Sequence, residues 1–314
     1  MGGKNSKPAE APRKITEKLK FHSFTCCILM LTFIFNFSVL VKPWRQVNWR
    51  DDQSALQFVN NYKPHVEGQQ IRVLLHGPIG AGKSSFINSV QSVLHGRISV
   101  QALVDNATHD CFTKQYKTYK IQKGNPDTFY PFVLNDIMGL KCSNRRSSKI
   151  HLKDMKRVLK GNVKDGYTFN ADCKISKEDR HYNTSPTLND KVHVLVCVID
   201  ANTTSLIKDE VLMGIQDIRD EASELGIPQV AIFTKIDQAC PETQEDVKNV
   251  YRSKLLKQKI EQFSADVGIP LNCIFPVKNY HEESDLDTDT NTLILNALRN
   301  IIHFGNDFLN HKNA

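Results

Sequence analysis

Short apolar runs alternate with longer stretches of helical periodicity along most of the chain. The apolar runs predict buried strands at residues 71–75, 130–134, 192–199, 229–233 and 273–276. Apolar residues at helical spacing predict helices over residues 51–62, 84–94, 150–159, 207–225, 244–267 and 292–310. Short strands that alternate with helices favour a mostly parallel sheet with helices on both faces, which is an α/β fold.

Two stretches depart from this alternation. Residues 112–121 are rich in tyrosine and threonine and alternate in polarity, which predicts an exposed or edge strand. Residues 161–191 are polar and lack periodicity, and a loop of this length in a compact domain is typically a lid or a disordered insert. We therefore expect a single domain over residues 44–314, in which residues 161–191 form a polar insert or lid.

Residues 1–43 differ from the rest of the chain and form a predicted tail. Residues 21–41 carry no charge and are long enough to cross a bilayer, although several polar side chains weaken this assignment. Gly2 and Ser6 fit the pattern for N-myristoylation, and nearby lysines supply the second signal that one acyl chain needs. A crossing segment would separate Gly2 from a cytoplasmic body, so it either dips into one leaflet, crosses without acylation or never meets lipid. We expect membrane association through the tail, without a defined topology.

Composition narrows the class of protein only slightly. The chain has 314 residues, 40% hydrophobic and 24% charged, as in ordinary globular proteins. The net charge of +7 arises largely from the first 20 residues and residues 141–164. The positive charge of residues 141–164 favours either a solvated helix face or a site for an acidic protein or anionic membrane. We expect no specific contact with nucleic acid. The eight cysteines form no CxxC pair, as expected in a reducing compartment.

The sequence HGPIGAGKSS directly follows the strand predicted at residues 71–75 and precedes a predicted helix. It satisfies the motif G-x-x-x-x-G-K-[ST], in which backbone N–H groups and the helix N terminus surround phosphates. The lysine reaches the β- and γ-phosphates and the serine hydroxyl binds Mg²⁺. A glycine-rich turn without a ligand is the alternative. The predicted phosphate-binding residues are Gly77, Gly80, Ala81, Gly82, Lys83, Ser84 and Ser85.

A second motif, D-x-x-G, ends the strand predicted at residues 130–134. Its acid, Asp136, is predicted to hold Mg²⁺ together with Ser84, and the N–H of Gly139 is predicted to meet the γ-phosphate. A threonine between the first helix and Asp136 should also close over Mg²⁺. Thr108 and Thr113 are both candidates, and the sequence does not decide between them.

A third motif, T-K-x-D, follows the strand predicted at residues 229–233 and indicates the base. Its members are Thr234, Lys235 and Asp237. A carboxylate at the last position accepts hydrogen bonds from N1–H and the 2-amino group of guanine, and each such bond contributes about 1.5–3 kcal/mol. Adenine lacks both donors, so guanine is favoured. Lys278 or Asn279, after the last predicted strand, would be the remaining base contact.

Two side chains predict slow hydrolysis of a bound triphosphate. Leu140 follows the D-x-x-G motif, where Ras-like enzymes carry a glutamine that orients water. Ile79 would crowd the path of a partner's arginine finger. Any faster hydrolysis would therefore come from another residue or from self-association across the nucleotide face.

Taken together, these motifs resemble the interferon-induced protein 44 family. The stretches IRVLLHGPIGAGKSSFINSV, FTKQYKTY, LNDIMGL, FTKID and PVKNY carry the resemblance, which begins at about residue 44. It implies a G-domain-like P-loop NTPase fold and a cytoplasmic, interferon-inducible protein of the antiviral or antiproliferative response. It also implies that this chain lacks the TLDc-type domain of longer members. The family's phosphate-loop residues fall on Gly77, Gly82, Lys83 and Ser84, and its base-reading residues on Lys235 and Asp237.

Three functions remain open at this point. The first is a GTP-binding switch or scaffold that uses Mg²⁺ with GTP or GDP and hydrolyses GTP slowly. The second is a P-loop ATPase, which a role for Asp237 in base selection would exclude. The third is an interaction protein with a vestigial pocket, in which replacing Lys83 would not change nucleotide binding.

Overall fold

The computed structural model describes residues 39–102, 114–141 and 145–314. This part of the chain contains a six-stranded sheet in the order β2-β3-β1-β4-β5-β6. The strands are β1 (Ile71–His76), β2 (Lys117–Gln122), β3 (Phe129–Asp136), β4 (Val194–Asp200), β5 (Gln229–Thr234) and β6 (Ile274–Pro276). All neighbours are parallel except β2 and β3, which pair antiparallel at one edge. The predicted mostly parallel sheet and its edge strand are confirmed.

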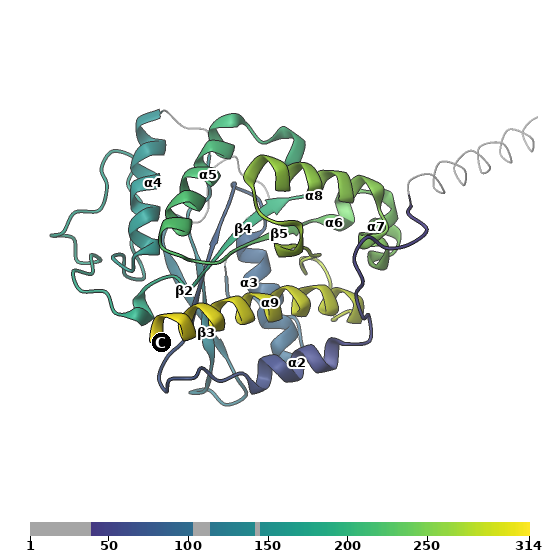
Figure 1. Cartoon of the computed structure of the whole chain (residues 1–314). Helices are drawn as coiled ribbons and strands as arrows, with labels where there is room; N and C mark the ends of the chain where they lie inside the picture. The colour runs from purple at the N-terminus through teal and green to yellow at the C-terminus, as the bar shows by residue number, and fades with distance from the viewer. Residues whose placement is uncertain (1–38, 103–113, 142–144) are drawn as a thin grey trace, which may run out of the picture.

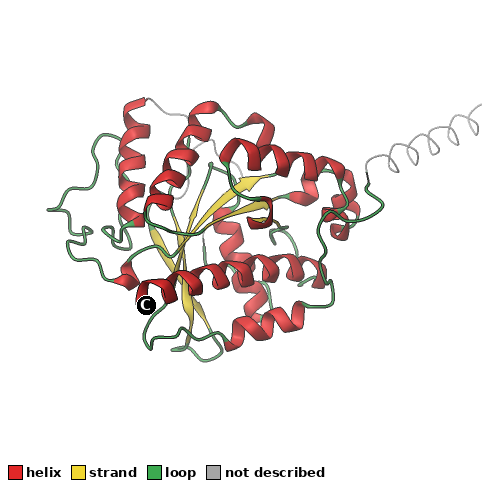
Figure 2. Cartoon of the chain, in the orientation of Figure 1, coloured by secondary structure: helices red, strands yellow, loops and turns green. Residues whose placement is uncertain are grey.

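Helices cover both faces of the sheet (Figures 1 and 2). One group contains α2 (Asp52–Asn61), α3 (Lys83–His95) and α9 (Thr288–Asn313). The other group contains α4 (Arg145–Leu159), α5 (Asp209–Glu224) and α8 (Lys254–Val267). The short helices are α6 (Ile236–Ala239), α7 (Pro241–Glu245) and the 3-10 turns η1 (Leu188–Asp190), η2 (Thr204–Leu206), η3 (Val247–Tyr251) and η4 (Leu271–Cys273). The predicted arrangement of helices on both faces is therefore confirmed.

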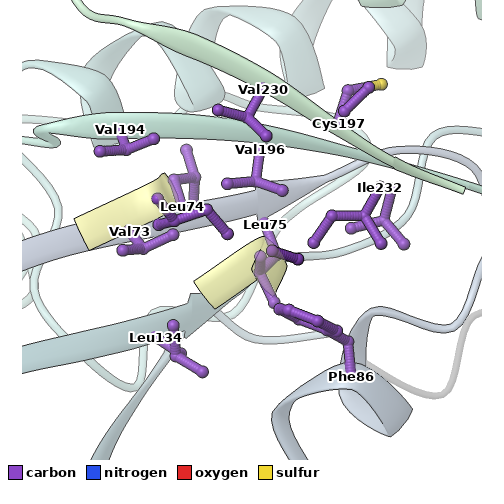
Figure 3. Packing of buried hydrophobic residues seen from close by; sticks show 14 of the residues in the cluster. Val73, Leu74, Leu75, Phe86, Leu134, Val194, Val196, Cys197, Val230 and Ile232 are labelled. Atoms are coloured by element: carbon purple, nitrogen blue, oxygen red, sulfur yellow. The ribbon is translucent and has the colours of Figure 1, made fainter. Parts of the chain in front are cut away.

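The core lies along the central strands β1, β4 and β5 (Figure 3). Every residue of β4 is buried, as expected for a parallel strand covered on both faces. Side chains such as Leu75, Val196 and Ile232 fill the centre. Because the carboxyl ends of the parallel strands share one edge, the motifs that follow β1, β3 and β5 are brought to the same side of the sheet.

The helix predicted over residues 244–267 is confirmed from Lys254 to Val267, but its first part is wrong. The structure has α7, η3 and α8 instead. Asp246 separates α7 from η3, Arg252 and Ser253 separate η3 from α8, and Asp246 and Ser253 are extended. The Asp246 side chain accepts a hydrogen bond from the backbone N–H of Lys248, and the Ser253 side chain accepts one from that of Leu256. Both residues are N-caps, which start new helices rather than continue one.

Residues 161–191 contain little regular structure but are packed against α4. Their apolar side chains Tyr167, Phe169 and Ile175 are buried. Asp154, on the inner side of α4, accepts hydrogen bonds from the Tyr167 hydroxyl at 2.8 Å and the Ile175 backbone N–H at 3.0 Å. This carboxylate therefore attaches the insert to the helix.

The start of the described chain lies against the body beside α8. Val39 forms an isolated bridge with Ser253, and the Trp44 ring meets the Tyr251 ring edge-on at 4.9 Å. Residues 1–38, which include Gly2 and most of the apolar segment, lie outside the described residues. In the part that is described, none of the helices combines the length and the apolar character that a membrane crossing requires.

Candidate functional site

The loop between β1 and α3 contains three glycines with positive φ angles. Gly77, Gly80 and Gly82 have φ angles of 139°, 73° and 87°, which residues with a side chain disfavour. At Gly77, a Cβ atom would lie 2.1 Å from the carbonyl oxygen of Val198 on β4. The loop therefore approaches the central strand so closely that only glycine fits at its first position.

The first two residues of α3 place an amine and a hydroxyl at this loop. Lys83 is only 7% exposed, and its Nζ lies 3.1 Å from the carbonyl oxygen of Pro78. Its ammonium group therefore lies within the loop. Ser84 Oγ donates to Asp136 Oδ2 at 2.5 Å, and Asp136 ends β3 as a fully buried carboxylate. The structure thus brings together the lysine and serine of the first motif and the acid of the second.

The Ser84–Asp136 pair has the donor chemistry that suits Mg²⁺. Hydroxyl and carboxylate oxygens are hard ligands, and Mg²⁺ at nucleotide sites usually takes its remaining ligands from water and phosphate oxygens. The described residues contain no group of three or more His, Cys, Asp or Glu side chains that could hold a metal ion. The pair therefore fits an ion shared with a phosphate ligand better than an ion held by protein alone.

Hydrogen bonds from β5 and from the segment after β6 fix the opposite side of the loop. Thr234 is fully buried, and its Oγ1 lies 2.7 Å from the carbonyl oxygen of Ala81. Asn279 Nδ2 donates to the carbonyl oxygen of Gly82 at 3.2 Å. Thr234, which the sequence predicts as a guanine contact, is therefore placed where its hydroxyl holds the phosphate loop.

Replacing Thr234 with valine should destabilise the fold by about 1–2 kcal/mol. Valine keeps the shape of threonine but leaves the buried carbonyl of Ala81 without this donor. Urea unfolding of the full chain measures the change. Thr128→Val is the matched control, since Thr128 is exposed and a surface substitution usually changes stability by less than about 0.5 kcal/mol. Equal effects of the two substitutions would contradict a stabilising tether.

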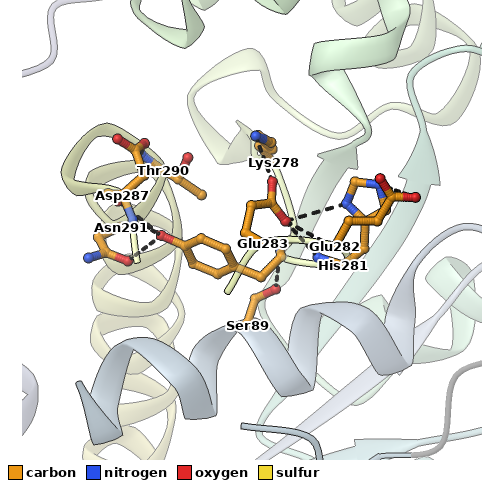
Figure 4. Close-up of polar contacts among 9 residues, drawn as sticks. Ser89, Lys278, His281, Glu282, Glu283, Asp287, Thr290 and Asn291 are labelled. Carbon is orange, nitrogen blue, oxygen red and sulfur yellow. Dashed lines mark hydrogen bonds and ion pairs between the residues drawn. The ribbon is translucent and has the colours of Figure 1, made fainter. Parts of the chain in front are cut away.

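Of the other predicted base-reading residues, Lys235 and Asp237 follow β5 and Lys278 follows β6, and both lysines form ion pairs. Lys235 adopts a left-handed conformation with φ of 55°, and its Nζ lies 2.8 Å from Oδ2 of Asp200 at the end of β4. Asp237 is half-buried in α6. Lys278 pairs with Glu283 at 2.8 Å (Figure 4). These contacts hold both lysines in defined positions.

The D-x-x-G loop lies directly against the phosphate loop. The backbone N–H of Leu140 donates to the carbonyl oxygen of Gly77 at 2.9 Å, and that of Ile79 donates to the carbonyl oxygen of Leu140 at 3.1 Å. A Cβ atom at Gly139 would come within 2.9 Å of Ile79, so this approach also requires glycine. The Leu140 side chain is buried and reaches Gly214 on α5.

A cavity of about 440 Å³ lies behind this loop, between α4, α5 and the insert. Leu140 and Gly139 form one wall, and Leu152, Phe169 and Val211 form others. Polar residues that include Ser148, His151 and Glu210 line the rest of the cavity, so the hydrocarbon side chain of Leu140 lies in mixed surroundings.

Three polar residues at the site were not among the sequence predictions or were left undecided there. Asp200 forms an ion pair with Lys235. Its position at the end of a buried apolar run was the only sign of this role in the sequence. Asn279 Oδ1 is buried and accepts no hydrogen bond from any described residue. His76, at the end of β1, is fully buried, and neither ring nitrogen has a hydrogen-bond partner among the described residues. Burial lowers the pKa of His76 to about 3, so its ring is neutral.

The remaining predicted residues divide into two groups. Within the phosphate loop, Gly80 is exposed, Ala81 is buried, and Ser85 is half-buried in the first turn of α3. Thr108 and Thr113, the two candidates for the switch threonine, lie outside the described residues.

Comparison with known proteins gives clear relatives. The chain is 37% identical over 257 residues to interferon-induced protein 44 of Mus musculus, a match that covers 82% of this chain and 60% of that protein. It is 36% identical to interferon-induced protein 44 of Homo sapiens, covering 82% and 57%, and 33% identical to the 44-like protein of Homo sapiens, covering 80% and 55%. The chain thus spans little more than half the length of these relatives. No family model matches it.

Among solved structures, the chain is similar to Toc33 of Arabidopsis thaliana. A dimerization-deficient mutant of Toc33 matches with a TM-score of 0.49 at 16% identity, over 82% of this chain and 92% of that one. Toc33 in complex with GDP and Mg²⁺ matches with a TM-score of 0.46 at 15% identity, over 83% and 97%. At these values the likeness is distant.

Proposed function

Since the chain is a relative of the interferon-induced protein 44 family, we propose that it is a guanine-nucleotide-binding protein of the interferon-induced antiviral response. Its GTPase-like α/β fold has a glycine loop between β1 and α3. The observation that carries the proposal is the convergence at one sheet edge of Lys83, the Ser84–Asp136 pair and the T-K-x-D segment.

In this proposal each group has a separate task. The N–H groups of the loop and the Lys83 ammonium bind the phosphates. Ser84 and Asp136 would hold Mg²⁺, which would neutralise phosphate charge when bound. Asp237 accepts hydrogen bonds from the guanine edge, and Lys235, positioned by Asp200, lies along the base.

The buried acceptor at Asn279 supports a ligand beside the T-K-x-D segment. Its amide nitrogen is already bonded to Gly82, so Oδ1 is left facing no donor among the described residues. A buried acceptor without a partner costs roughly 1–3 kcal/mol, and an N–H donor of a bound base would remove that cost. We propose Asn279 as a base contact in addition to Lys278, whose amine is paired with Glu283.

Slow hydrolysis is a further part of this proposal. The Leu140 side chain is buried against Gly214 and carries no group that can position water. We therefore propose a slow GTPase or a nucleotide-gated scaffold, whose turnover rises only if another residue or a second copy of the chain supplies the missing group. An ATPase and a vestigial pocket remain the alternatives, and the variants below distinguish them.

Isothermal titration of the full chain with GTP, GDP and ATP in the presence of Mg²⁺ tests nucleotide binding. We expect GTP and GDP to bind and Lys83→Ala to weaken GTP by about 100-fold, since a buried cation that pairs with phosphate is removed. Lys257→Ala, at a half-exposed lysine of α8, is the control. Equal, negligible binding by wild type and Lys83→Ala would instead indicate a vestigial pocket.

Replacing Asp237 with asparagine tests base selection. The substitution exchanges an acceptor for a donor, so affinity for GTP should fall and affinity for xanthosine triphosphate should rise, each by about tenfold or more. The same titration measures both. A variant that keeps its preference for GTP, or a wild type that prefers ATP, would contradict guanine recognition by this residue.

A further inference from the structure

The outer side of α4 carries basic side chains that the fold does not use. Three basic residues of this region have partners: Lys156 and Lys160 bind Glu221 on α5, and Arg157 binds Asp154. In contrast, three exposed residues at helical spacing, Arg146, Lys149 and Lys153, form no ion pair with any described residue.

These three side chains line an open groove of about 750 Å³. Its other wall is residues 172–174 of the insert, which add Lys174 and Asp172. Ile150 contributes an apolar surface between them. Asp154 holds this wall in place from the inner side of α4, through Tyr167 and Ile175, so the groove has two fixed sides. Four cations and one anion thus line the groove, together with the aliphatic side chain of Ile150.

We propose that this groove binds an acidic peptide segment of a partner protein. Clusters of basic side chains recognise acidic segments by charge complementarity, and Ile150 offers a contact for an aliphatic side chain between the acids. A peptide segment can enter between α4 and residues 172–174 and contact both walls, whereas a membrane surface would contact only the outermost side chains. The vesicle experiment below tests the membrane. The proposal does not depend on nucleotide binding.

The test uses a fluorescein-labelled peptide of glutamate and aspartate with a central leucine, added to the full chain without nucleotide. Fluorescence anisotropy should show binding that weakens as salt is raised, because the charges are exposed. A neutral peptide, in which glutamine and asparagine replace the acids, should not bind. Failure of wild type to bind the acidic peptide, or equal binding of both peptides, would overturn the proposal.

Charge reversal locates the site. The triple variant Arg146→Glu, Lys149→Glu and Lys153→Glu should lower affinity by at least about tenfold. The matched control, Lys42→Glu, Arg50→Glu and Lys63→Glu, changes the net charge equally at exposed positions elsewhere. Neutral substitutions of the first set with glutamine give a second test if reversal perturbs the fold. Equal weakening by the two reversal sets would show attraction to net charge alone and would overturn the proposal.

Two further measurements give readouts that are independent of affinity. Cys173 is exposed and lines the groove, so bound acidic peptide should slow its alkylation by iodoacetamide, as measured by peptide mass spectrometry. An unchanged alkylation rate at saturating peptide would contradict occupancy of the groove.

Vesicles of phosphatidylserine and phosphatidylcholine test an anionic membrane as the other class of partner. Binding to these vesicles that needs Arg146, Lys149 and Lys153, without binding to the acidic peptide, would replace the proposal with a membrane contact.

Discussion

Lowering the pH from about 7.5 to about 5 should reduce the free energy of unfolding by about 6 kcal/mol, largely through three buried histidines. Burial lowers the pKa of His76 to about 3 and the pKa values of His151 and His193 to about 4, all from 6.5. Because the unfolded imidazoles take up protons below about pH 6.5 and the folded ones do not, stability is complete above that pH. By pH 5, each buried histidine has lowered the free energy of unfolding by about 2 kcal/mol.

The geometry of His193 supports a neutral ring independently of burial. Its Nδ1 accepts a hydrogen bond from the backbone N–H of Arg72 at 2.9 Å, so Nε2 carries the proton and donates to the carbonyl oxygen of Leu188 at 2.8 Å. A proton on Nδ1 would oppose the Arg72 N–H. Protonation is therefore incompatible with the native contacts of this residue.

Urea unfolding of the full chain between about pH 5 and 7.5 measures this dependence, and one substitution isolates a single histidine. His76→Leu should reduce the loss of stability over that range by about 2 kcal/mol, since the imidazole that titrates on unfolding is removed. His65→Gln, at an exposed position, is the control. Identical pH profiles of stability for wild type and His76→Leu would refute the assignment of this pH dependence to buried histidines.

Paired carboxylates contribute to the pH dependence of stability at lower pH. Burial alone would raise the pKa of Glu283, but the hydrogen bond from the His281 N–H and the ion pair with Lys278 outweigh burial and lower this pKa to about 2.

Replacing Gly77 with alanine should destabilise the protein by about 4 kcal/mol, from a strained backbone and a steric clash together. The φ angle of 139° disfavours a side chain, and the Cβ atom would meet the carbonyl oxygen of Val198 at 2.1 Å. That oxygen belongs to the backbone of a fully buried central strand, which cannot move aside without disturbing its neighbours.

Gly80→Ala is the matched control for this substitution. Gly80 also has a positive φ, of 73°, but a Cβ atom there would meet nothing within 4 Å. The loss should therefore be about 1–2 kcal/mol, from conformation alone. Thermal or urea unfolding of both variants gives the comparison. If the two alanine variants lose the same stability, the close approach of the loop to β4 has no energetic weight.

The strands and the three motifs were predictable because each depends on neighbouring residues. Apolar runs such as 192–199 identify buried strands, and a motif at a strand end follows the strand to the carboxyl edge of the sheet. The break between α7 and α8 was missed because apolar periodicity continues across Asp246 and Ser253, whose capping bonds interrupt the helix.

The contacts that position the site depend on residues far apart in the sequence. Thr234 is 153 residues from Ala81, and Asp200 is 35 residues from Lys235. Nothing in the T-K-x-D motif indicates which of its side chains faces the loop and which faces a ligand. For the same reason, the role of Asp154 was hidden: among nine basic residues it resembles a solvated acid, whereas the fold buries it beneath the insert.

The paired backbone bonds between Leu140 and the phosphate loop have a mechanical consequence. Separating the two loops would break both bonds, at roughly 1 kcal/mol each. A displacement of either loop would therefore pull the other with it. The Leu140 side chain packs against α5 at Gly214, and Glu221 of α5 forms ion pairs with Lys156 and Lys160. A displacement of the phosphate loop would therefore be transmitted through Leu140 to α5 and α4.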